Sequence, residues 1–127
     1  MITVIVLSDM GISMDIIKNL CAHLNAPVGR METMNYLDNR IIVDYAHTPD
    51  AMEKLIHTVK SVCDGNIYAV FGCTGSRERE KRPVMMKIAT TLCKYVIVTI
   101  DDLHEEDAND IVADMLKDNH NENYEVE

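Results

Sequence analysis

Basic residues are scarce in this chain of 127 residues, which has 12 lysines and arginines against 21 aspartates and glutamates and a formal net charge of −9. This balance argues against a general nucleic-acid binder and against a protein that adheres to anionic membranes, because both need a basic face. No apolar run approaches the roughly 18–20 residues that span a bilayer. The apolar start has no basic leader and is soon followed by Asp9, so we expect no signal peptide.

Other patterns are also missing. None of the four cysteines belongs to a Cys-x-x-Cys pair or shows metal-ligand spacing, which favours reduced thiols in a cytoplasmic protein. The Walker A phosphate loop, internal repeats and low-complexity segments are absent too. What remains is the composition of a soluble globular protein, with 47% hydrophobic and 26% charged residues, and a length that suits one domain or part of one.

The most informative stretch is residues 40–49. Residues 41–43 form an unbroken run of β-branched side chains, which predicts a strand buried on both faces. Asp44 and His47 follow it, and Thr48-Pro49 is typical of a helix start. A strand, a polar turn and a capped helix predict half of a βαβ unit. Ligands of parallel sheets bind at the carboxyl ends of the strands, where Asp44 and His47 would lie.

The other patterns predict an α/β fold with a parallel sheet. Residues 1–8 fit a strand or a buried helix equally well, and residues 31–36 and 40–45 predict a hairpin. Val62 and Val84 are expected on the inward faces of their helices. The remaining expected elements are helices over 13–24, 48–63, from Pro83 and over 107–117, strands over 67–71 and 95–100, and a possible fourth strand from Tyr124.

Three polar loops, 44–47, 72–82 and 101–104, each follow a predicted strand, so we expect them at one sheet edge and around one ligand. Gly72 and Gly75 fit either an anion-binding loop or a plain strand-to-helix turn. The arginines after them alternate with glutamates. They fit either a solvent-exposed run whose charges compensate each other, or a site where a guanidinium binds a carboxylate or phosphate through two hydrogen bonds. Asp101 and Asp102 fit a Mg²⁺ site or a capping turn. The histidines without convergent partners are expected on the surface: His23, His57 and His120.

Three segments together resemble the Mur ligases. They are Val28-Gly-Arg-Met-Glu32, Val43-Asp-Tyr-Ala-His-Thr-Pro-Asp-Ala51, and Phe71-Gly-Cys with Gly75, Arg77 and Lys81-Arg-Pro83. The chain is most similar to the tripeptide-forming type, which adds diaminopimelate or lysine to a UDP-MurNAc-dipeptide. The resemblance implies a three-layer Rossmann-like parallel sheet preceded by a helix and a β-hairpin. Residues 1–30 would correspond to the end of the central domain and its linker, and residues 31–127 to part of the C-terminal domain.

The family's site residues can be transferred only by this resemblance. It implies that Arg30 and Asp44 approach the ribose of ATP, that His47 lies near the phosphates, and that Arg77 meets the carboxylate of the incoming amino acid. Residues 101–104 stand where the family has an amino-acid-selecting Asp-Asn-Pro-Arg motif. Asp101, Asp102 and His104 would therefore bind the amino acid, with Leu103 and His104 in place of Pro and Arg.

The resemblance also implies ATP and Mg²⁺ as ligands and a part in peptidoglycan precursor synthesis. The family's phosphate loop and UDP-binding domain have no counterpart in the sequence, so the chain is not expected to catalyse ligation alone, and no catalytic residue is assigned. The alternative is a non-catalytic binding module derived from such a ligase. Its partner would be an intact ligase, the missing domains or a second copy, because three parallel strands leave an unpaired edge.

Overall fold

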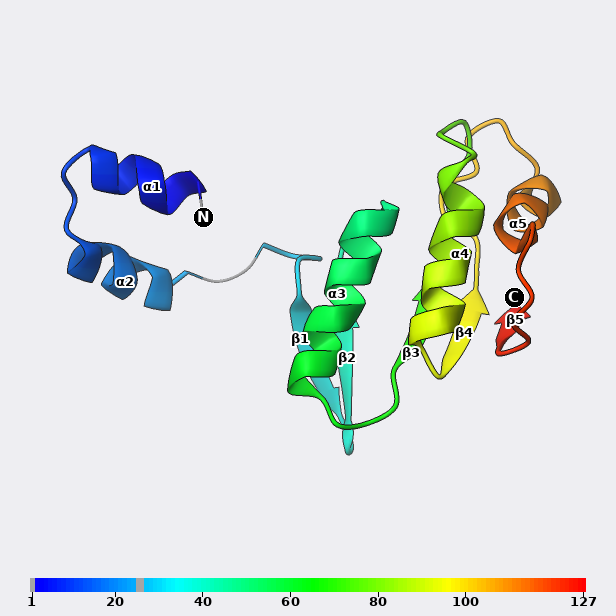
Figure 1. Ribbon diagram of the computed structural model, residues 1–127, viewed down its shortest axis with the longest axis horizontal. Coiled ribbons are helices and arrows are strands. Elements are labelled where there is room, and N and C mark those ends of the chain that lie inside the picture. Colours follow the sequence, from blue (N-terminus) through cyan, green and yellow to red (C-terminus); the bar gives the residue numbers. More distant parts are fainter. Residues whose placement is uncertain (1, 25–26) are drawn as a thin grey trace. The chain divides into compact units, whose positions relative to one another are not determined.

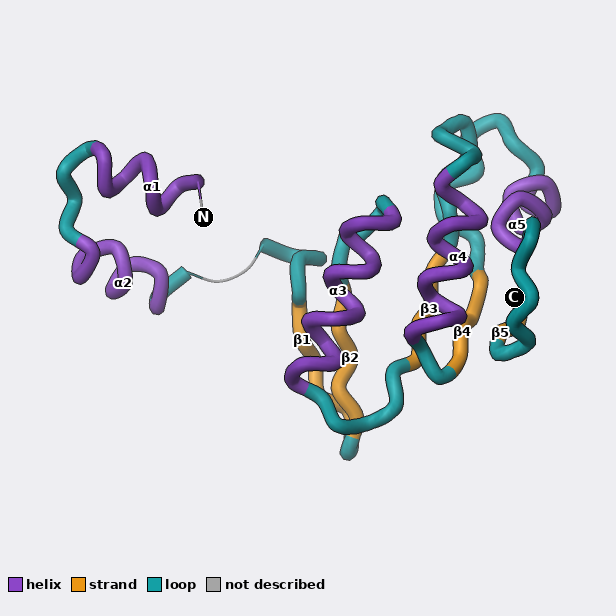
Figure 2. The backbone as a smooth tube through the Cα atoms, viewed as in Figure 1, coloured by secondary structure: helices purple, strands orange, loops and turns teal. Residues whose placement is uncertain are grey.

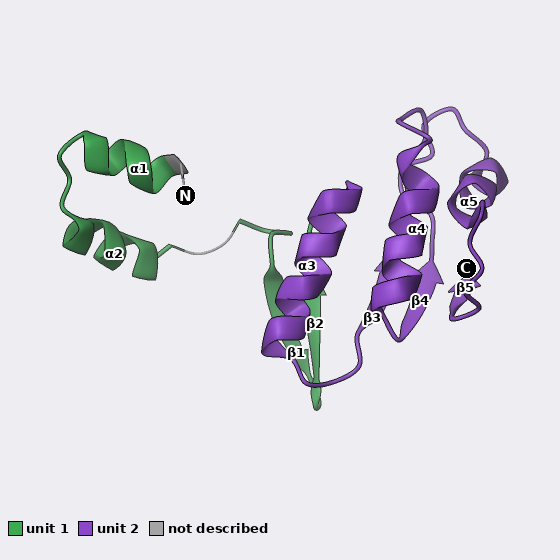
Figure 3. Cartoon of the chain, viewed as in Figure 1, with its two compact units in different colours: residues 1–45 green, residues 46–127 purple. Residues whose placement is uncertain are grey.

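The computed structural model describes residues 2–24 and 27–127, and the chain divides into two compact units, residues 1–45 and 46–127 (Figure 3). Each unit has its own packing and is described by itself. The domain boundary expected after residue 30 rests on the resemblance and stays a prediction. Among the described residues, no helix combines the length and apolar character needed to cross a membrane.

Two short helices open the first unit, α1 (Ile2–Asp9) and α2 (Met14–Ala22). The apolar start, for which strand and helix were both open, is therefore helical from residue 2 onward. Ser13 caps α2 as predicted, because its hydroxyl accepts a hydrogen bond from the N–H of Ile16 at 3.5 Å. The helix ends before the Pro and Gly expected to stop it, and residues 1 and 25–26 lie outside the described part of the chain.

The predicted hairpin is confirmed. Strands β1 (Glu32–Tyr36) and β2 (Asn39–Val43) pair antiparallel around a two-residue turn, Leu37-Asp38. Leu37 has a φ of +51°, in the left-handed region where glycine is favoured.

The predicted role of β2 in a βαβ unit is wrong. Among the described residues this strand pairs with β1 alone, in a sheet separate from the parallel one. Ile41 and Val43 are exposed and Ile42 is partly buried, so the strand is not covered on both faces. The physical reason is local: a two-residue turn brings neighbouring strands together at little entropic cost, and β-branched residues favour exposed as well as buried strands.

The second unit contains the predicted parallel sheet. It begins with α3 (Pro49–Val62) and continues as β3 (Tyr68–Phe71), α4 (Lys81–Leu92), β4 (Tyr95–Val98), α5 (Ala108–Leu116) and β5 (Tyr124–Val126). The strands lie in the order β3-β4-β5, all parallel. Figures 1 and 2 show α4 alongside β3 and β4, the two strands that it connects. The fourth expected strand, from Tyr124, is confirmed as β5.

Local signals set where these helices begin. The hydroxyl of Thr48 accepts a hydrogen bond from the N–H of Ala51 at 3.3 Å, with Pro49 in the first turn, as predicted. The carboxylate of Asp107 caps α5 in the same way. Helix α4 begins at Lys81, two residues earlier than predicted, with Pro83 tolerated in its first turn.

Helices α3, α4 and α5 contribute to one core on one face of the sheet, as expected when successive right-handed crossovers step in the same direction. The opposite face carries Tyr68 and Val70, each 64% exposed, and Ala69 and Phe71 on the core side are partly buried. The expectation that β3 is a buried strand is therefore wrong for one of its faces. Val62 and Val84 are exposed, contrary to expectation. The core consists of Met52, Ile56, Cys73, Met85, Met86, Ala89, Cys93, Val96, Val98, Ile111 and Met115.

Candidate functional site

The loops that leave β3 and β4 start from the carboxyl ends of neighbouring parallel strands and are bonded to each other. The N–H of Gly75 donates to the carbonyl of Asp102 at 2.8 Å, and the hydroxyl of Thr74 donates to Asp101 Oδ2 at 2.9 Å. Two of the three loops expected at one edge are therefore joined, as the parallel sheet predicts.

The two glycines of the first loop allow this close approach. A Cβ on Gly75 would overlap the carbonyl oxygen of Leu103, and one on Gly72 would lie 2.8 Å from the backbone nitrogen of Asp101. Because the Gly75 N–H already donates to Asp102, it is not part of an anion-binding loop. Of the two readings left open, the structure supports the turn, and it adds a reason for both glycines.

Arg77 lies exposed on the β3 exit loop, directly after Ser76, whose φ is +52°. Within the part of the chain that the structure describes, the Arg77 side chain has no hydrogen-bond or ion-pair partner. Its guanidinium is therefore open to an external carboxylate, as the resemblance requires.

On the facing loop, Asp102 closes a tight turn with His104. Asp102 Oδ1 accepts a hydrogen bond from the His104 N–H at 3.1 Å, and Oδ2 lies 3.7 Å from His104 Nε2. His104 has a φ of +49°, unusual for a residue with a side chain. The hydrogen bond from the His104 N–H to Asp102 fits the turn that the sequence left open as one of two readings. Among the described residues there is no group of three or more His, Cys, Asp or Glu side chains that could hold a metal ion.

Arg82 is the functional candidate that the sequence reasoning did not single out. Its side chain is fully buried, and its guanidinium forks onto the protein's own carboxylates. Nη1 donates to Asp114 Oδ2 at 2.7 Å, and Nη2 donates to Glu106 Oε2 and to the carbonyl of Thr74 at 3.2 Å. One signal could have revealed it: Arg82 precedes buried Met85, Met86 and Ala89 at helical spacing.

Arg79 extends this network on the exposed side, where its Nε donates to Asp114 Oδ2 at 2.7 Å. That hydrogen bond lowers the pKa of the Asp114 carboxyl, although desolvation works against it, and it raises the pKa of Arg79. The charged run 77–82 is therefore neither purely solvated nor aimed wholly at a ligand. Two of its arginines are paired internally.

The described cysteines are unpaired, with Cys73 and Cys93 buried. Burial raises the pKa of the Cys73 thiol, mainly by desolvation, although Lys81 and Arg82 lower it. The thiol is thus mostly protonated near neutral pH and is not a nucleophile candidate. His23, His57 and His120 are exposed, as predicted.

The first unit brings together two of the residues assigned to the nucleotide. Asp44 Oδ2 accepts a hydrogen bond from the Met31 N–H at 2.9 Å, and the Arg30 guanidinium lies over the Tyr45 ring, 4.9 Å from its centroid. Arg30 and Asp44 thus flank a compact turn beside the hairpin. Arg30 and Asp44 belong to the first unit, whereas Arg77 and residues 101–104 belong to the second.

His47 belongs to the second unit, immediately before the α3 cap, and is exposed. Its carbonyl accepts a hydrogen bond from Lys81 Nζ at 3.1 Å. This contact joins the start of α3 to the start of α4, the helix that carries Arg82.

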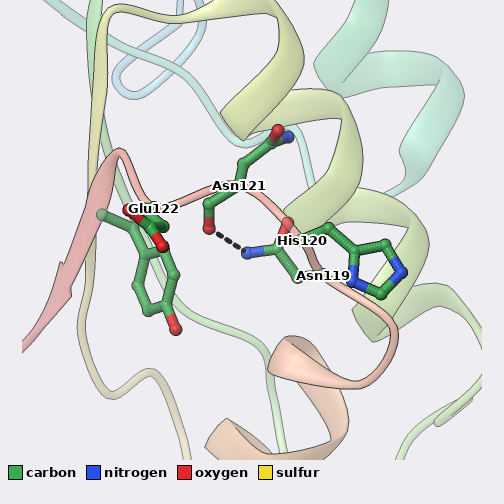
Figure 4. A pocket seen from close by; sticks show the side chains of 5 residues that line it. Asn119, His120, Asn121 and Glu122 are labelled. Carbon is green, nitrogen blue, oxygen red and sulfur yellow. Dashed lines mark hydrogen bonds between the residues drawn. The ribbon is translucent and has the colours of Figure 1, made fainter.

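A hollow of about 500 Å³ lies elsewhere, beside the loop that enters β5. Figure 4 shows its lining of Asn119, His120, Asn121 and Glu122, with a hydrogen bond from Asn119 Nδ2 to the Asn121 carbonyl at 3.1 Å. Since this loop precedes its strand, the hollow is at the amino end of β5, away from the carboxyl-end loops. Asn121 and Asn123 bond Thr90 and the end of α4, which gives this loop a structural role.

Comparisons with known proteins agree with this architecture. Residues 29–127 match the family described as Mur ligase, glutamate ligase domain. The UDP-N-acetylmuramoyl-L-alanyl-D-glutamate–2,6-diaminopimelate ligase of Vibrio vulnificus (strain YJ016) is 40% identical over 108 residues, covering 84% of this chain and 22% of that protein. A solved structure of a ligase of the same name is 32% identical with a TM-score of 0.73, covering 98% of this chain and 26% of that one.

A third comparison concerns the fold alone. Folylpolyglutamate synthase of Mycobacterium tuberculosis, solved with ADP, is 17% identical with a TM-score of 0.73, covering 96% of this chain and 27% of that one. The chain spans about 22% of the length of the Vibrio vulnificus relative. With the family matched over residues 29–127 and the joined loops where a parallel sheet places them, the chain belongs to the Mur ligase family.

Proposed function

We propose that this chain is the amino-acid- and nucleotide-binding part of an ATP-dependent ligase that extends a UDP-MurNAc-peptide in peptidoglycan precursor synthesis. The observation that carries the proposal is the pair of exit loops, joined by the bonds of Thr74 to Asp101 and of Gly75 to Asp102. Arg77 follows Gly75 by two residues and its side chain has no hydrogen-bond or ion-pair partner among the described residues, so its guanidinium is open to a ligand held by these loops. The names of the 2,6-diaminopimelate ligases support diaminopimelate as the amino acid, with lysine as the alternative.

The chemistry of the second unit suits a zwitterionic amino acid. The Arg77 guanidinium offers a planar pair of donors to a carboxylate. Asp101 and Asp102 place negative charge on the facing loop, where an ammonium group would be attracted. By the resemblance, His104 takes the position of the motif's arginine, and a ring N–H of His104 can donate to a second carboxylate.

The first unit offers a carboxylate, a guanidinium and an aromatic ring to a nucleotide. We infer that Asp44 binds the ribose hydroxyls and that Arg30, held over Tyr45, lies beside the same ribose. For His47, which belongs to the second unit, a place near the phosphates is implied by the resemblance alone. ATP supplies the phosphoryl group for activation of the acceptor carboxyl. Mg²⁺, which the resemblance implies, would be held mainly by the phosphates of ATP and water, and no step is assigned to the ion in this chain.

Binding, rather than ligation, is the activity proposed for the chain by itself. Its residues position ligands, and the remaining parts of a ligase would come from another polypeptide segment or an intact ligase. ATP and UDP-linked precursors are cytoplasmic substrates, and the unpaired cysteines fit that compartment.

A specific observation favours a second candidate, a non-catalytic module that binds an intact ligase or a second copy. Tyr68 and Val70 expose apolar side chains on the sheet face opposite the core, and their strand β3 is an edge strand among the described residues, a position where another chain can pair.

Calorimetry with diaminopimelate, with lysine and with ATP–Mg²⁺ tests the proposal. Arg77→Ala should weaken amino-acid binding about tenfold or more, the value of one charge-assisted hydrogen bond, while Lys87→Ala on the exposed side of α4 should not. Asp44→Asn should weaken ATP binding, with Asp38→Asn in the hairpin turn as its control. Failure of both ligands to bind the unmodified chain contradicts the proposal and leaves the interaction module.

A further inference from the structure

Arg82 is a fully buried charge that contacts three segments of the second unit. Its guanidinium bonds the β3 exit loop through the Thr74 carbonyl, the β4 exit loop through Glu106, and α5 through Asp114. A buried arginine is costly unless its donors are satisfied. Three of the five Arg82 N–H groups donate to these partners, while the buried Nε has no partner among the described residues.

We propose that Arg82 is the positioning residue of the amino-acid site, an inference that rests on the proposed function. It fixes the two exit loops in the register that sets Arg77 against residues 101–104. Thr74, whose carbonyl binds Arg82, also bonds Asp101 through its hydroxyl, and the next residue, Gly75, bonds Asp102. On the other loop, the N–H of Glu106 donates to the Leu103 carbonyl at 3.0 Å. Each loop is thus tied to Arg82 beside its ligand-binding residues.

Charge balance shows that Arg82 acts through these loops and not on a ligand. Arg79, Asp114, Arg82 and Glu106 alternate in sign along one chain of ion pairs, two positive and two negative. The Arg82 guanidinium faces protein carboxylates and has no exposed surface, whereas Arg77, five residues earlier, is exposed.

The planar fork of arginine is what this arrangement needs. Two nitrogens point to carboxylates on different segments while one of them also reaches a carbonyl, and a lysine ammonium is a single point charge that cannot reproduce this geometry. Arg82→Lys therefore keeps the charge and the helix while removing the fork. Glu106→Gln removes the negative charge from the connection to the β4 exit loop and leaves a neutral amide oxygen as the acceptor. Arg79→Lys is the control for the shared carboxylate, since the Arg79 side chain bonds Asp114 and, among the described residues, makes no hydrogen bond to the facing loop or to Thr74.

Amide hydrogen exchange on the full chain, followed by NMR, measures whether the hydrogen bond between the two exit loops, from the Gly75 N–H to the Asp102 carbonyl, is kept. We expect Arg82→Lys and Glu106→Gln to speed exchange at the Gly75 N–H about tenfold or more, the effect of losing one charge-assisted hydrogen bond. The Val96 N–H, which donates to Asn123 in the sheet, should keep its rate in both variants. Both should weaken diaminopimelate or lysine binding by a similar factor, and Arg79→Lys should change neither quantity.

Unchanged exchange at Gly75 in both variants overturns the proposal, as does an equal loss of protection at Gly75 and Val96, which would mean a general stabilising role. If Arg82→Lys fails to fold, Glu106→Gln decides alone. If the unmodified chain binds neither amino acid, the proposed function fails, while the Gly75 exchange rates still decide whether Arg82 sets the register of the loops.

Discussion

At the scale of single residues, Gly75 is the position where the smallest change should have the clearest effect. We expect Gly75→Ala to destabilise the second unit by about 1–3 kcal/mol, because its methyl group would overlap the Leu103 carbonyl and backbone cannot move aside as a side chain can. Gly65→Ala is the matched control, since a Cβ there would lie 3.6 Å from Cys63 Sγ, an ordinary contact. Urea denaturation of both variants measures the difference, and equal stabilities would contradict this role for Gly75.

Residues also show where sequence reasoning succeeds and where it fails. Ser13 and Thr48 were predictable as caps because each acts on a backbone N–H three residues away. The ion pairs of Arg82 were not predictable, because its partners Glu106 and Asp114 lie 24 and 32 residues further along the chain, although its helical spacing to apolar residues places it on the inward face. The sequence of a charged run does not tell which of its residues forms buried ion pairs. The arrangement of the fold decides that.

At the scale of elements, the hairpin turn is strained at Leu37. A left-handed φ of +51° costs a leucine roughly 1–2 kcal/mol relative to an ordinary conformation. We expect Leu37→Gly to relieve this strain and slow hydrogen exchange of the β1–β2 amides, corresponding to a net gain of about 0.5–1 kcal/mol after the added freedom of the unfolded chain is subtracted. Asp38→Gly, at the neighbouring position without a positive φ, should instead speed exchange. A gain in both variants would contradict the strain argument.

The order of the helices and strands could be predicted from the sequence, whereas the pairing of one strand could not. The order of strands and helices after residue 48 follows from periodicity and turn residues, and it places Arg77 and residues 101–104 at neighbouring strand ends. Strand β2 carries the same β-branched signal as β3 and β4 but pairs in a different sheet. Propensity predicts that a strand forms, whereas the partner depends on the turn before it, and here the two-residue turn favours β1.

At the scale of the whole molecule, the uncovered sheet face of the second unit has a consequence in solution. Tyr68 and Val70 lie on β3, which is an edge strand among the described residues, so apolar surface and unpaired backbone groups coincide. Proteins usually cover such edges or place charges on them. We therefore expect the chain to self-associate as its concentration rises, and Val70→Lys to reduce this association by setting a charge on the face.

Sedimentation velocity over a range of concentrations tests this expectation with a closely matched control. Val62 on α3 is 63% exposed, against 64% for Val70, but it lies on a helix and not on the sheet. Val62→Lys adds the same charge and removes the same apolar side chain at nearly equal exposure, so any general effect of solubility should be shared by both variants. Association that falls in Val70→Lys and persists in Val62→Lys assigns the contact to the sheet face. A monomer at the highest concentration in the unmodified chain contradicts it, and then the exposed sheet face must be covered by a different protein or remain in water.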